Sequence, residues 1–262
     1  DEPIDLLIRI FCEPRIDNIV AIDPTYGMYQ VCADINGVAY RKVLLNDDFS
    51  LNADRVLAAT DVHTKLIFLC SPNNPTGNSL DREEIRKIVS GFEGIVIVDE
   101  AYIDFSSEAS WLPESDTYLN LPVLQTFSKA WGLASVRCGM AFASEEIIGY
   151  LNNVKYPYNL NLLTQEFVSK QLDFESRKTE WVDMLLKQRA FLQEQLGGIP
   201  WIEKIYPSDA NFLLVKVPDA NQLYNQLVVK GIIIRNRNKI SLCLGCLRIT
   251  VGTQAENNIL IN

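Results

Sequence analysis

Short apolar runs alternate with stretches of helical periodicity along the first 100 residues. Residues 1–12 place apolar side chains three or four positions apart, at Ile4, Leu7, Ile8 and Phe11, which is the spacing of one helix face. The same reading predicts strands at 18–22, 38–45, 65–70 and 94–98 and helices at 26–36, 52–59 and 81–90. Strands that lack polar alternation are buried on both faces, so the pattern predicts a mostly parallel sheet covered by helices on both sides.

The pattern changes after residue 143. A long helical stretch from about 160 to 196 ends at Gly197-Gly198, and the remaining segments are short. Strands are predicted at 201–206, 211–217, 232–235 and 247–251 and a helix at 220–230. We therefore expect an α/β chain with two domains, a large domain over 1–155 and a linker helix with a smaller α+β domain over 156–262.

Composition and charge narrow the classes of partner. The 262 residues are 48% hydrophobic and 22% charged, enough to bury a sizeable core. A net charge of −9 and a pI near 4.8 argue against nucleic acid or an anionic membrane surface as the main partner. The longest apolar runs, such as 66–70 and 95–98, are far shorter than the ~20 residues that span a bilayer. We expect neither a nucleic-acid partner nor a membrane span.

The six cysteines are scattered through the chain with no basic and apolar leader before them, which favours a reducing cytoplasm over a disulfide scaffold. Cys243 and Cys246 form the one close pair. With no second pair and only His63 as a histidine, a structural zinc site lacks ligands. We expect these cysteines to pack in the core and the chain to bind no metal.

Polar side chains that could act in catalysis or ligand binding follow the predicted strands. The segments are Ser71-Pro-Asn-Asn-Pro-Thr-Gly77, Asp99-Glu-Ala-Tyr102 and, after the apolar run 121–125, Thr126-Phe-Ser-Lys129 with Arg137 further on. Each alone is ordinary turn, cap or helix-start chemistry. In an open α/β sheet, however, the carboxyl ends of the strands meet at one edge, where ligands bind. Together the segments supply an amine, a carboxylate, a phenol, an amide, hydroxyls and a guanidinium, which suit an aldehyde cofactor with a pyridine ring and a phosphate.

The same motifs carry a resemblance. The chain resembles the fold-type I pyridoxal-phosphate aminotransferases and, among them, the histidinol-phosphate aminotransferase family, over essentially its whole length. The matching segments are Pro24-Thr-Tyr26-Gly-Met-Tyr29, the three strand-end segments above, Gly231-Ile-Ile-Ile-Arg235 and Gly245-Cys-Leu-Arg248-Ile-Thr-Val-Gly252. One departure is Ser135, where the family usually has glycine, and it removes no functional group.

The resemblance implies a role for each site residue. Lys129 would form the covalent link to the cofactor aldehyde and move a proton during the reaction. Asp99 would face the pyridine nitrogen and keep it protonated, while Tyr102 and Asn74 would bond the ring oxygen. Tyr26 would stack on the ring, unless it is an ordinary core residue.

Anion binding is implied at two further places. The cofactor phosphate would contact Arg137, Thr126, Ser128 and the backbone near Asp1 and Glu2 at a helix start. The resemblance also implies that Arg248 and Arg235, with Tyr26 and Asn74, bind substrate, Arg248 at a carboxylate and Arg235 at a phosphate.

The implied activity belongs to histidine biosynthesis. Glutamate would leave its amino group on the cofactor and depart as 2-oxoglutarate, and imidazole-acetol phosphate would then receive that nitrogen to give histidinol phosphate, in a ping-pong scheme. The resemblance also implies a cytoplasmic homodimer with sites at the interface. A phospho-amino-acid decarboxylase on the same fold would share Lys129, Asp99 and Arg137, and a non-catalytic fragment is a third alternative.

The beginning of the chain leads to one more expectation. Asp1-Glu-Pro-Ile-Asp reads as the first turn of a helix whose amides would receive the cofactor phosphate, yet a loop leading into it would lie upstream of residue 1. We expect these residues to belong to a longer chain that extends beyond both ends.

Overall fold

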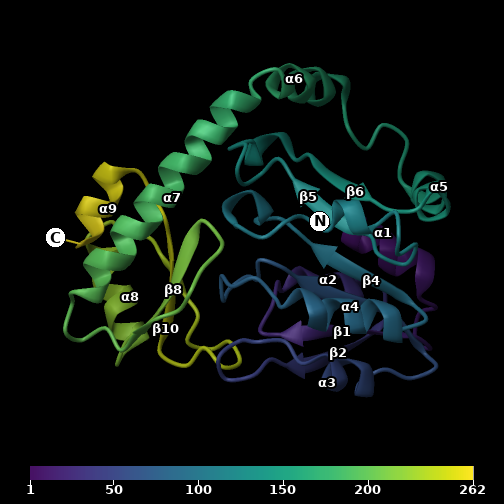
Figure 1. Cartoon of the computed structure of the whole chain (residues 1–262), viewed down its shortest axis with the longest axis horizontal. Coiled ribbons are helices and arrows are strands. Elements are labelled where there is room, and N and C mark those ends of the chain that lie inside the picture. Colours follow the sequence, from purple (N-terminus) through teal and green to yellow (C-terminus); the bar gives the residue numbers. More distant parts are fainter. Residues whose placement is uncertain (262) are drawn as a thin grey trace.

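A six-stranded sheet forms the larger part of the molecule (Figure 1). The computed structural model describes residues 1–261. The strand order is β2-β1-β3-β4-β5-β6, with every neighbouring pair parallel except β5 and β6. The bounds are β1 Asn18–Asp23, β2 Ala39–Leu44, β3 Thr64–Cys70, β4 Ile95–Asp99, β5 Val123–Thr126 and β6 Gly139–Phe142. The predicted parallel sheet and the α/β class are confirmed.

Helices cover both faces of this sheet. One buried cluster joins the strands to α1 (Glu2–Phe11), α2 (Met28–Ile35) and α5 (Glu145–Val154). The other joins them to α3 (Ala53–Ala58) and α4 (Arg82–Gly91), whose first turns are capped by Asn52 and Asp81. Buried β3 and β4 lie between the two clusters, which explains their unbroken apolar sequence.

The second sheet lies beside the first and is antiparallel throughout, in the order β7-β8-β10-β9. It packs against α7 and α8 around a separate apolar cluster. The elements are α7 Glu175–Gly197, β7 Lys204–Ile205, β8 Phe212–Lys216, α8 Ala220–Val229, β9 Arg235–Asn236, β10 Cys246–Thr250 and α9 Gln254–Ile261. A smaller α+β unit is therefore present, while the boundary at 155/156 stays a prediction.

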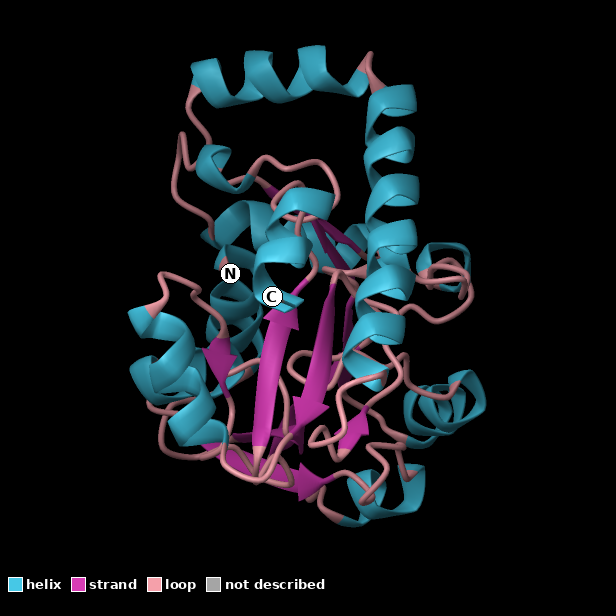
Figure 2. Cartoon of the chain, turned by 90° about the vertical axis from the view of Figure 1, so that its left-hand side faces the viewer, coloured by secondary structure: helices cyan, strands magenta, loops and turns pink. Residues whose placement is uncertain are grey.

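The prediction of one continuous helix from 160 to 196 is wrong. The segment forms α6 (Leu162–Leu172) and α7, which meet at a sharp corner (Figure 2). Phe174 has φ −110° and ψ 35°, outside the helical region, and its N–H bonds the Gln171 carbonyl in a tightened last turn. No Gly or Pro marks this corner in the sequence, so apolar spacing alone could not reveal it. The elements α5, α9 and β6 were not predicted from the sequence.

Contacts along α7 hold the two sheets together. Lys178 Nζ lies 2.9 Å from Asp104 Oδ1, and Arg189 donates to the carbonyls of Phe105 and Ala210. A fourth apolar cluster, which includes Tyr102 and Phe212, fills the space between the units. The relative position of the two sheets is thus set by buried contacts next to the strand-end segments.

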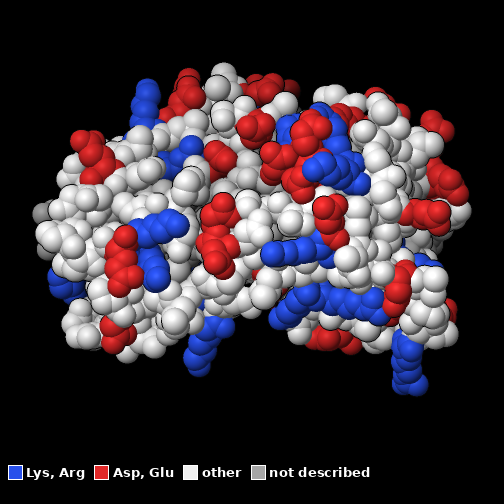
Figure 3. Space-filling model, turned by 60° about the horizontal axis from the view of Figure 1, so that its bottom comes forward, with Lys and Arg blue, Asp and Glu red and all other residues white. Residues whose placement is uncertain are grey.

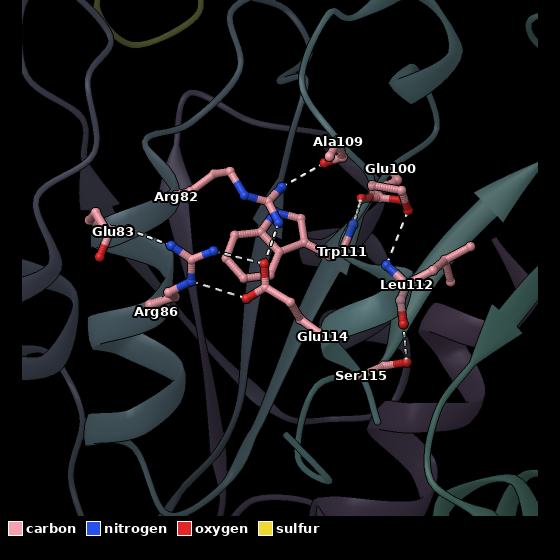
Figure 4. Close-up of polar contacts among 10 residues, drawn as sticks. Arg82, Glu83, Arg86, Glu100, Ala109, Trp111, Leu112, Glu114 and Ser115 are labelled. Atoms are coloured by element: carbon pink, nitrogen blue, oxygen red, sulfur yellow. Dashed lines mark hydrogen bonds and ion pairs between the residues drawn. The ribbon is translucent and has the colours of Figure 1, made fainter. Parts of the chain in front are cut away.

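A polar network fixes the loop between β4 and β5 (Figure 4). The buried Glu100 carboxylate accepts hydrogen bonds from Ser110 Oγ and Trp111 N, both at 2.6 Å, and from Gln125 Nε2 at 2.8 Å. The Arg82 guanidinium lies over the Trp111 ring, 4.1 Å from its centroid. Because Glu100 directly follows Asp99, this network also anchors the end of β4.

The distribution of surface charge and the character of the helices are the two structural properties that bear on the expected partners. The face in Figure 3 carries acidic and basic side chains interspersed, with no extended basic area. Over residues 1–261, no helix combines the length and apolar character needed to cross a bilayer.

Candidate active site

One cavity of about 440 Å³ lies between the carboxyl ends of β3, β4 and β5 and the face of the smaller sheet. Nearly all the predicted site residues line it: Asp1, Tyr26, Asn74, Asp99, Tyr102, Thr126, Ser128, Lys129, Arg137, Arg235 and Arg248. Its size is within the range of small-molecule sites. The residue types expected to act together are therefore brought together, although their roles stay predictions.

Glu2 is the one predicted site residue that does not line this cavity. It borders a neighbouring hollow, and its carboxylate accepts a hydrogen bond from Asn159 Nδ2 at 3.0 Å. A role for Glu2 at the cofactor phosphate thus rests on its backbone N–H at the start of α1.

Asp99 ends β4 and is the buried acid of the cavity. Its Oδ2 accepts a hydrogen bond from the Tyr29 hydroxyl at 2.7 Å, and its Oδ1 accepts one from Ala101 N at 3.1 Å. Burial raises the pKa of Asp99, while the Tyr29 and Ala101 hydrogen bonds and the Lys129 charge act in the opposite direction. A cationic ring nitrogen beside this carboxylate would favour its ionised form further.

Tyr29 is a site component that the sequence analysis did not identify. It is fully buried in α2, where its ring stacks on Phe68 with centroids 4.8 Å apart, and burial next to Asp99 raises the pKa of its hydroxyl. The sequence predicted that this helix begins at Tyr26. The helix begins at Met28 instead, so Tyr26 lies in the preceding loop. A tyrosine on the apolar face of a helix is typical of a core residue. Only the structure shows that its hydroxyl donates a hydrogen bond to Asp99.

Lys129 follows β5 and reaches into the cavity. Its Nζ lies 5.2 Å from the centroid of the Tyr102 ring. Burial, and next the Arg248 charge, lower the pKa of the Lys129 amine. A lowered pKa raises the fraction of neutral amine, the form that attacks a carbonyl carbon.

Arg248 on β10 connects the smaller sheet to the loop after β3. Its Nη1 donates to Asn74 Oδ1 at 2.6 Å, and its guanidinium lies over the Phe212 ring, 4.7 Å from the centroid. Its buried Nε has no hydrogen-bond partner among the described residues. Because this Nε is buried, a ligand in the cavity would be bound by the terminal nitrogens of Arg248.

Tyr102 and Asn74 present a phenol and an amide beside Arg248. Burial raises the pKa of Tyr102 to about 12, with the Arg248 charge opposing the shift, so the hydroxyl is protonated at neutral pH and can donate. The loop of Asn74 is fixed at Gly77, where φ is 88° and an added Cβ would lie 2.7 Å from Ser208 Oγ. A glycine is required there for the loop to approach the smaller unit.

Arg137 and the start of α1 form the other end of the cavity. The Arg137 Nη2 lies 3.3 Å from Asp1 Oδ2, and Tyr26 donates its hydroxyl to Asp1 Oδ1 at 2.8 Å. Arg137 has φ 53°, an uncommon conformation for a non-glycine residue that is often found at ligand sites. Ser135 lies in the 3-10 turn Ala134–Val136 with no positive φ, which explains why serine is tolerated there.

Thr126 and Ser128 lie at the same end. Thr126 Oγ1 accepts a hydrogen bond from Ser128 N at 3.0 Å, which holds the turn after β5, and both residues line the cavity. A guanidinium, two hydroxyls and the amides of a helix start are a suitable donor set for a phosphate.

Arg237 is a cavity residue that was not identified from the sequence. It lines the wall next to Arg235 and Arg248. In the sequence it is one of several charged residues in a polar segment, and only the strand register shows where it points. The Cys243 and Cys246 pair is buried nearby, and residues 1–261 contain no group of three or more His, Cys, Asp or Glu placed to hold a metal.

Comparisons with known proteins identify relatives over the length of the chain. A histidinol-phosphate aminotransferase of Bacteroides fragilis (strain YCH46) is 60% identical over 261 residues, which cover 100% of this chain and 76% of that protein. The crystal structure of the histidinol-phosphate aminotransferase from Clostridium acetobutylicum has a TM-score of 0.92 at 23% identity, with 99% of this chain and 79% of that one covered.

A decarboxylase shares the fold more distantly. The crystal structure of L-threonine-O-3-phosphate decarboxylase from Porphyromonas gingivalis has a TM-score of 0.83 at 20% identity, with 99% of this chain and 78% of that one covered. At such identities the likeness to these two structures shows the fold alone. Residues 1–262 match the family model described as Aminotransferase class I and II. The chain belongs to the class I and II aminotransferase family.

Proposed function

We propose that this protein is a histidinol-phosphate aminotransferase, which moves an amino group between glutamate and 2-oxoglutarate on one side and histidinol phosphate and imidazole-acetol phosphate on the other. The observation that carries the proposal is a single cavity that combines Lys129 with the buried Asp99 and with arginines from both sheets. The 60% identity to an aminotransferase with this substrate in its name supports the choice of substrate.

The residues present fit pyridoxal phosphate, the cofactor of this family. The Asp1 carboxylate pairs with Arg137 where a phosphate would be held, and Asp99 offers a buried carboxylate for a cationic ring nitrogen. Thr126, Ser128 and the first amides of α1 would complete the phosphate contacts. When bound, this cofactor supplies an aldehyde carbon that takes up the amino group and a ring that draws electron density from the reacting carbon.

Protein groups position the reactants and move the proton. Lys129 Nζ, with its lowered pKa, would form the covalent link in the resting enzyme and then carry a proton between the two reacting carbons. Tyr102 and Asn74 would donate to the ring oxygen, and Tyr26 would cover the ring face. Asp99, held by Tyr29, would keep the ring nitrogen protonated.

Arg248 would serve both half-reactions. One amino-group partner carries an α-carboxylate and the other a phosphate ester, and a guanidinium binds either anion through paired donors. The position of Arg248 on the wall opposite the strand-end segments supports this role.

The visible absorption spectrum tests the function. Addition of glutamate to the cofactor-loaded protein should convert the spectrum to that of the aminated cofactor, and imidazole-acetol phosphate should reverse it. Release of carbon dioxide from a phospho-amino acid, without glutamate-dependent amino transfer, would instead identify a decarboxylase.

We also infer a homodimer in the cytoplasm. Large apolar side chains are exposed after α5 and at the start of α6, among them Tyr156, Leu162 and Leu163 at 71%, 67% and 78% exposure, and they offer a surface for a second copy. Six free cysteines suit a reducing compartment. Light scattering coupled to size exclusion would measure the mass in solution, and a monomer at working concentration would contradict the dimer.

A further inference from the structure

Three arginines share one face of the smaller sheet. In the antiparallel register of β9 and β10, Arg248 lies opposite Arg235. The ladder continues beyond β9, because Arg237 N donates to the Cys246 carbonyl at 3.0 Å. Side chains two residues apart in extended chain point to the same side, so Arg237 projects beside Arg235. All three line the cavity.

No acid of the cavity neutralises this group of arginines. Among residues 1–261, none of the three forms an ion pair, whereas Arg82 and Arg86 share Glu114 elsewhere in the molecule. The two cavity carboxylates have other partners, Asp1 with Arg137 and Asp99 with Tyr29. Within the described part of the chain, the Arg237 side chain donates only one hydrogen bond, a long one of 3.5 Å to the carbonyl of Asn236.

Crowding of like charges makes this wall a strong anion site. Burial lowers the pKa of Arg237, and the charges of Arg248 and Arg235 lower it further. An anion that enters relieves this repulsion in proportion to its charge. A carboxylate carries one negative charge and two oxygens, which one guanidinium can satisfy. A phosphate ester carries about −1.5 to −2 charges near pH 7 and three free oxygens, and it therefore gains more from a third guanidinium.

We propose that Arg237 is a specificity-determining residue that favours the phosphate ester over the carboxylate substrate. It donates to the phosphate of histidinol phosphate or imidazole-acetol phosphate together with Arg235, and it contributes little to the binding of glutamate at Arg248. This inference rests on the proposed function, which supplies one substrate with its anionic charge concentrated on a phosphate and another, glutamate, with its anionic charge divided between two carboxylates.

The test compares the two half-reactions in the cofactor-loaded full protein. Arg237→Gln should lower kcat/KM for histidinol phosphate by about 10- to 100-fold, the loss typical of a charge-assisted hydrogen bond, with a change of less than about threefold for glutamate. Arg237→Lys should recover part of the loss, since it restores the charge but not the paired donors. Lys239→Gln is the matched control, because Lys239 is exposed on the same segment and does not line the cavity.

Inorganic phosphate gives a readout that does not depend on the proposed substrate. It should compete with glutamate in the wild type, and Arg237→Gln should weaken that inhibition about tenfold or more, while Lys239→Gln should not. Equal losses for both substrates, or no loss for the phosphate ester, would overturn the inference. If the wild-type protein does not use histidinol phosphate, the proposed function is refuted. In that case the phosphate inhibition still tests Arg237, and unchanged inhibition in Arg237→Gln would overturn its role as an anion-binding residue.

Discussion

Removal of the Tyr29 hydroxyl tests whether this residue keeps Asp99 ionised. In Tyr29→Phe the ring still stacks on Phe68, and only the 2.7 Å hydrogen bond to Asp99 Oδ2 is lost. A hydrogen bond to a charged group contributes about 1.5–3 kcal/mol, and 1.36 kcal/mol corresponds to one pKa unit. The Ala101 N–H still bonds the carboxylate. We therefore expect the pKa of Asp99 to rise further in the variant.

The pH dependence of stability follows with a definite sign. Burial already raises the folded-state pKa of Asp99, so its contribution to stability is fully present below the unfolded pKa of about 3.9 and is lost as pH rises through the folded pKa. Tyr29→Phe moves the folded pKa higher and enlarges that loss. In the cofactor-free protein, the difference in unfolding free energy between wild type and variant should be small near pH 4 and should grow toward pH 7–8.

Two measurements follow this effect. Denaturant titrations at several pH values give the stability difference. Titration of the visible absorbance with cofactor gives the cofactor affinity. This affinity should fall by about tenfold or more in Tyr29→Phe, because the ring nitrogen loses an ionised partner. Tyr224→Phe, in α8 and away from the cavity, is the control. A pH-independent stability difference together with unchanged cofactor affinity would show that Tyr29 is only a core residue.

Three further substitutions address other parts of the site. Lys129→Ala should leave folding intact and reduce turnover by more than about 100-fold, measured as amino transfer from glutamate, and a smaller loss would contradict its role as the proton carrier. Arg248→Ala should raise KM for both glutamate and histidinol phosphate by about tenfold or more, and a defect confined to one substrate would refute the shared anion site. Glu100→Gln should destabilise the protein by about 1–3 kcal/mol in thermal or denaturant unfolding, because an amide donor would face the groups that now donate to Glu100. An unchanged stability would show that the loop network is dispensable.

The regular buried elements were predictable from the sequence. The corner between α6 and α7 and the edge strand β6 were not. The runs of β3 and β4 are apolar without interruption because helices cover both faces. β6 is four residues long and only partly buried, so it carries no distinctive pattern. The corner at Phe174 depends on backbone dihedrals that no Gly or Pro announces.

The site shows the same limit. Lys129 and Asp99 were predicted as site residues because their segments come after apolar runs, and parallel strand ends converge on one edge. Tyr29 was missed because its ring belongs to the core and only its hydroxyl belongs to the site. Arg237 was missed because its place depends on the pairing of β9 with β10, which the sequence does not specify.

The hydrogen bond between Arg248 and Asn74 has a consequence for the order of folding, because it joins residues 174 positions apart. The larger sheet consists of residues 18–142 and can assemble while the later part of the chain is still being synthesised. The cavity wall that carries Arg248 exists only after β10 has paired with β8. Contacts of such long sequence separation form late, since the entropy of closing a long loop must be overcome first. Capture of substrate with full affinity therefore reports that both units have reached their native arrangement.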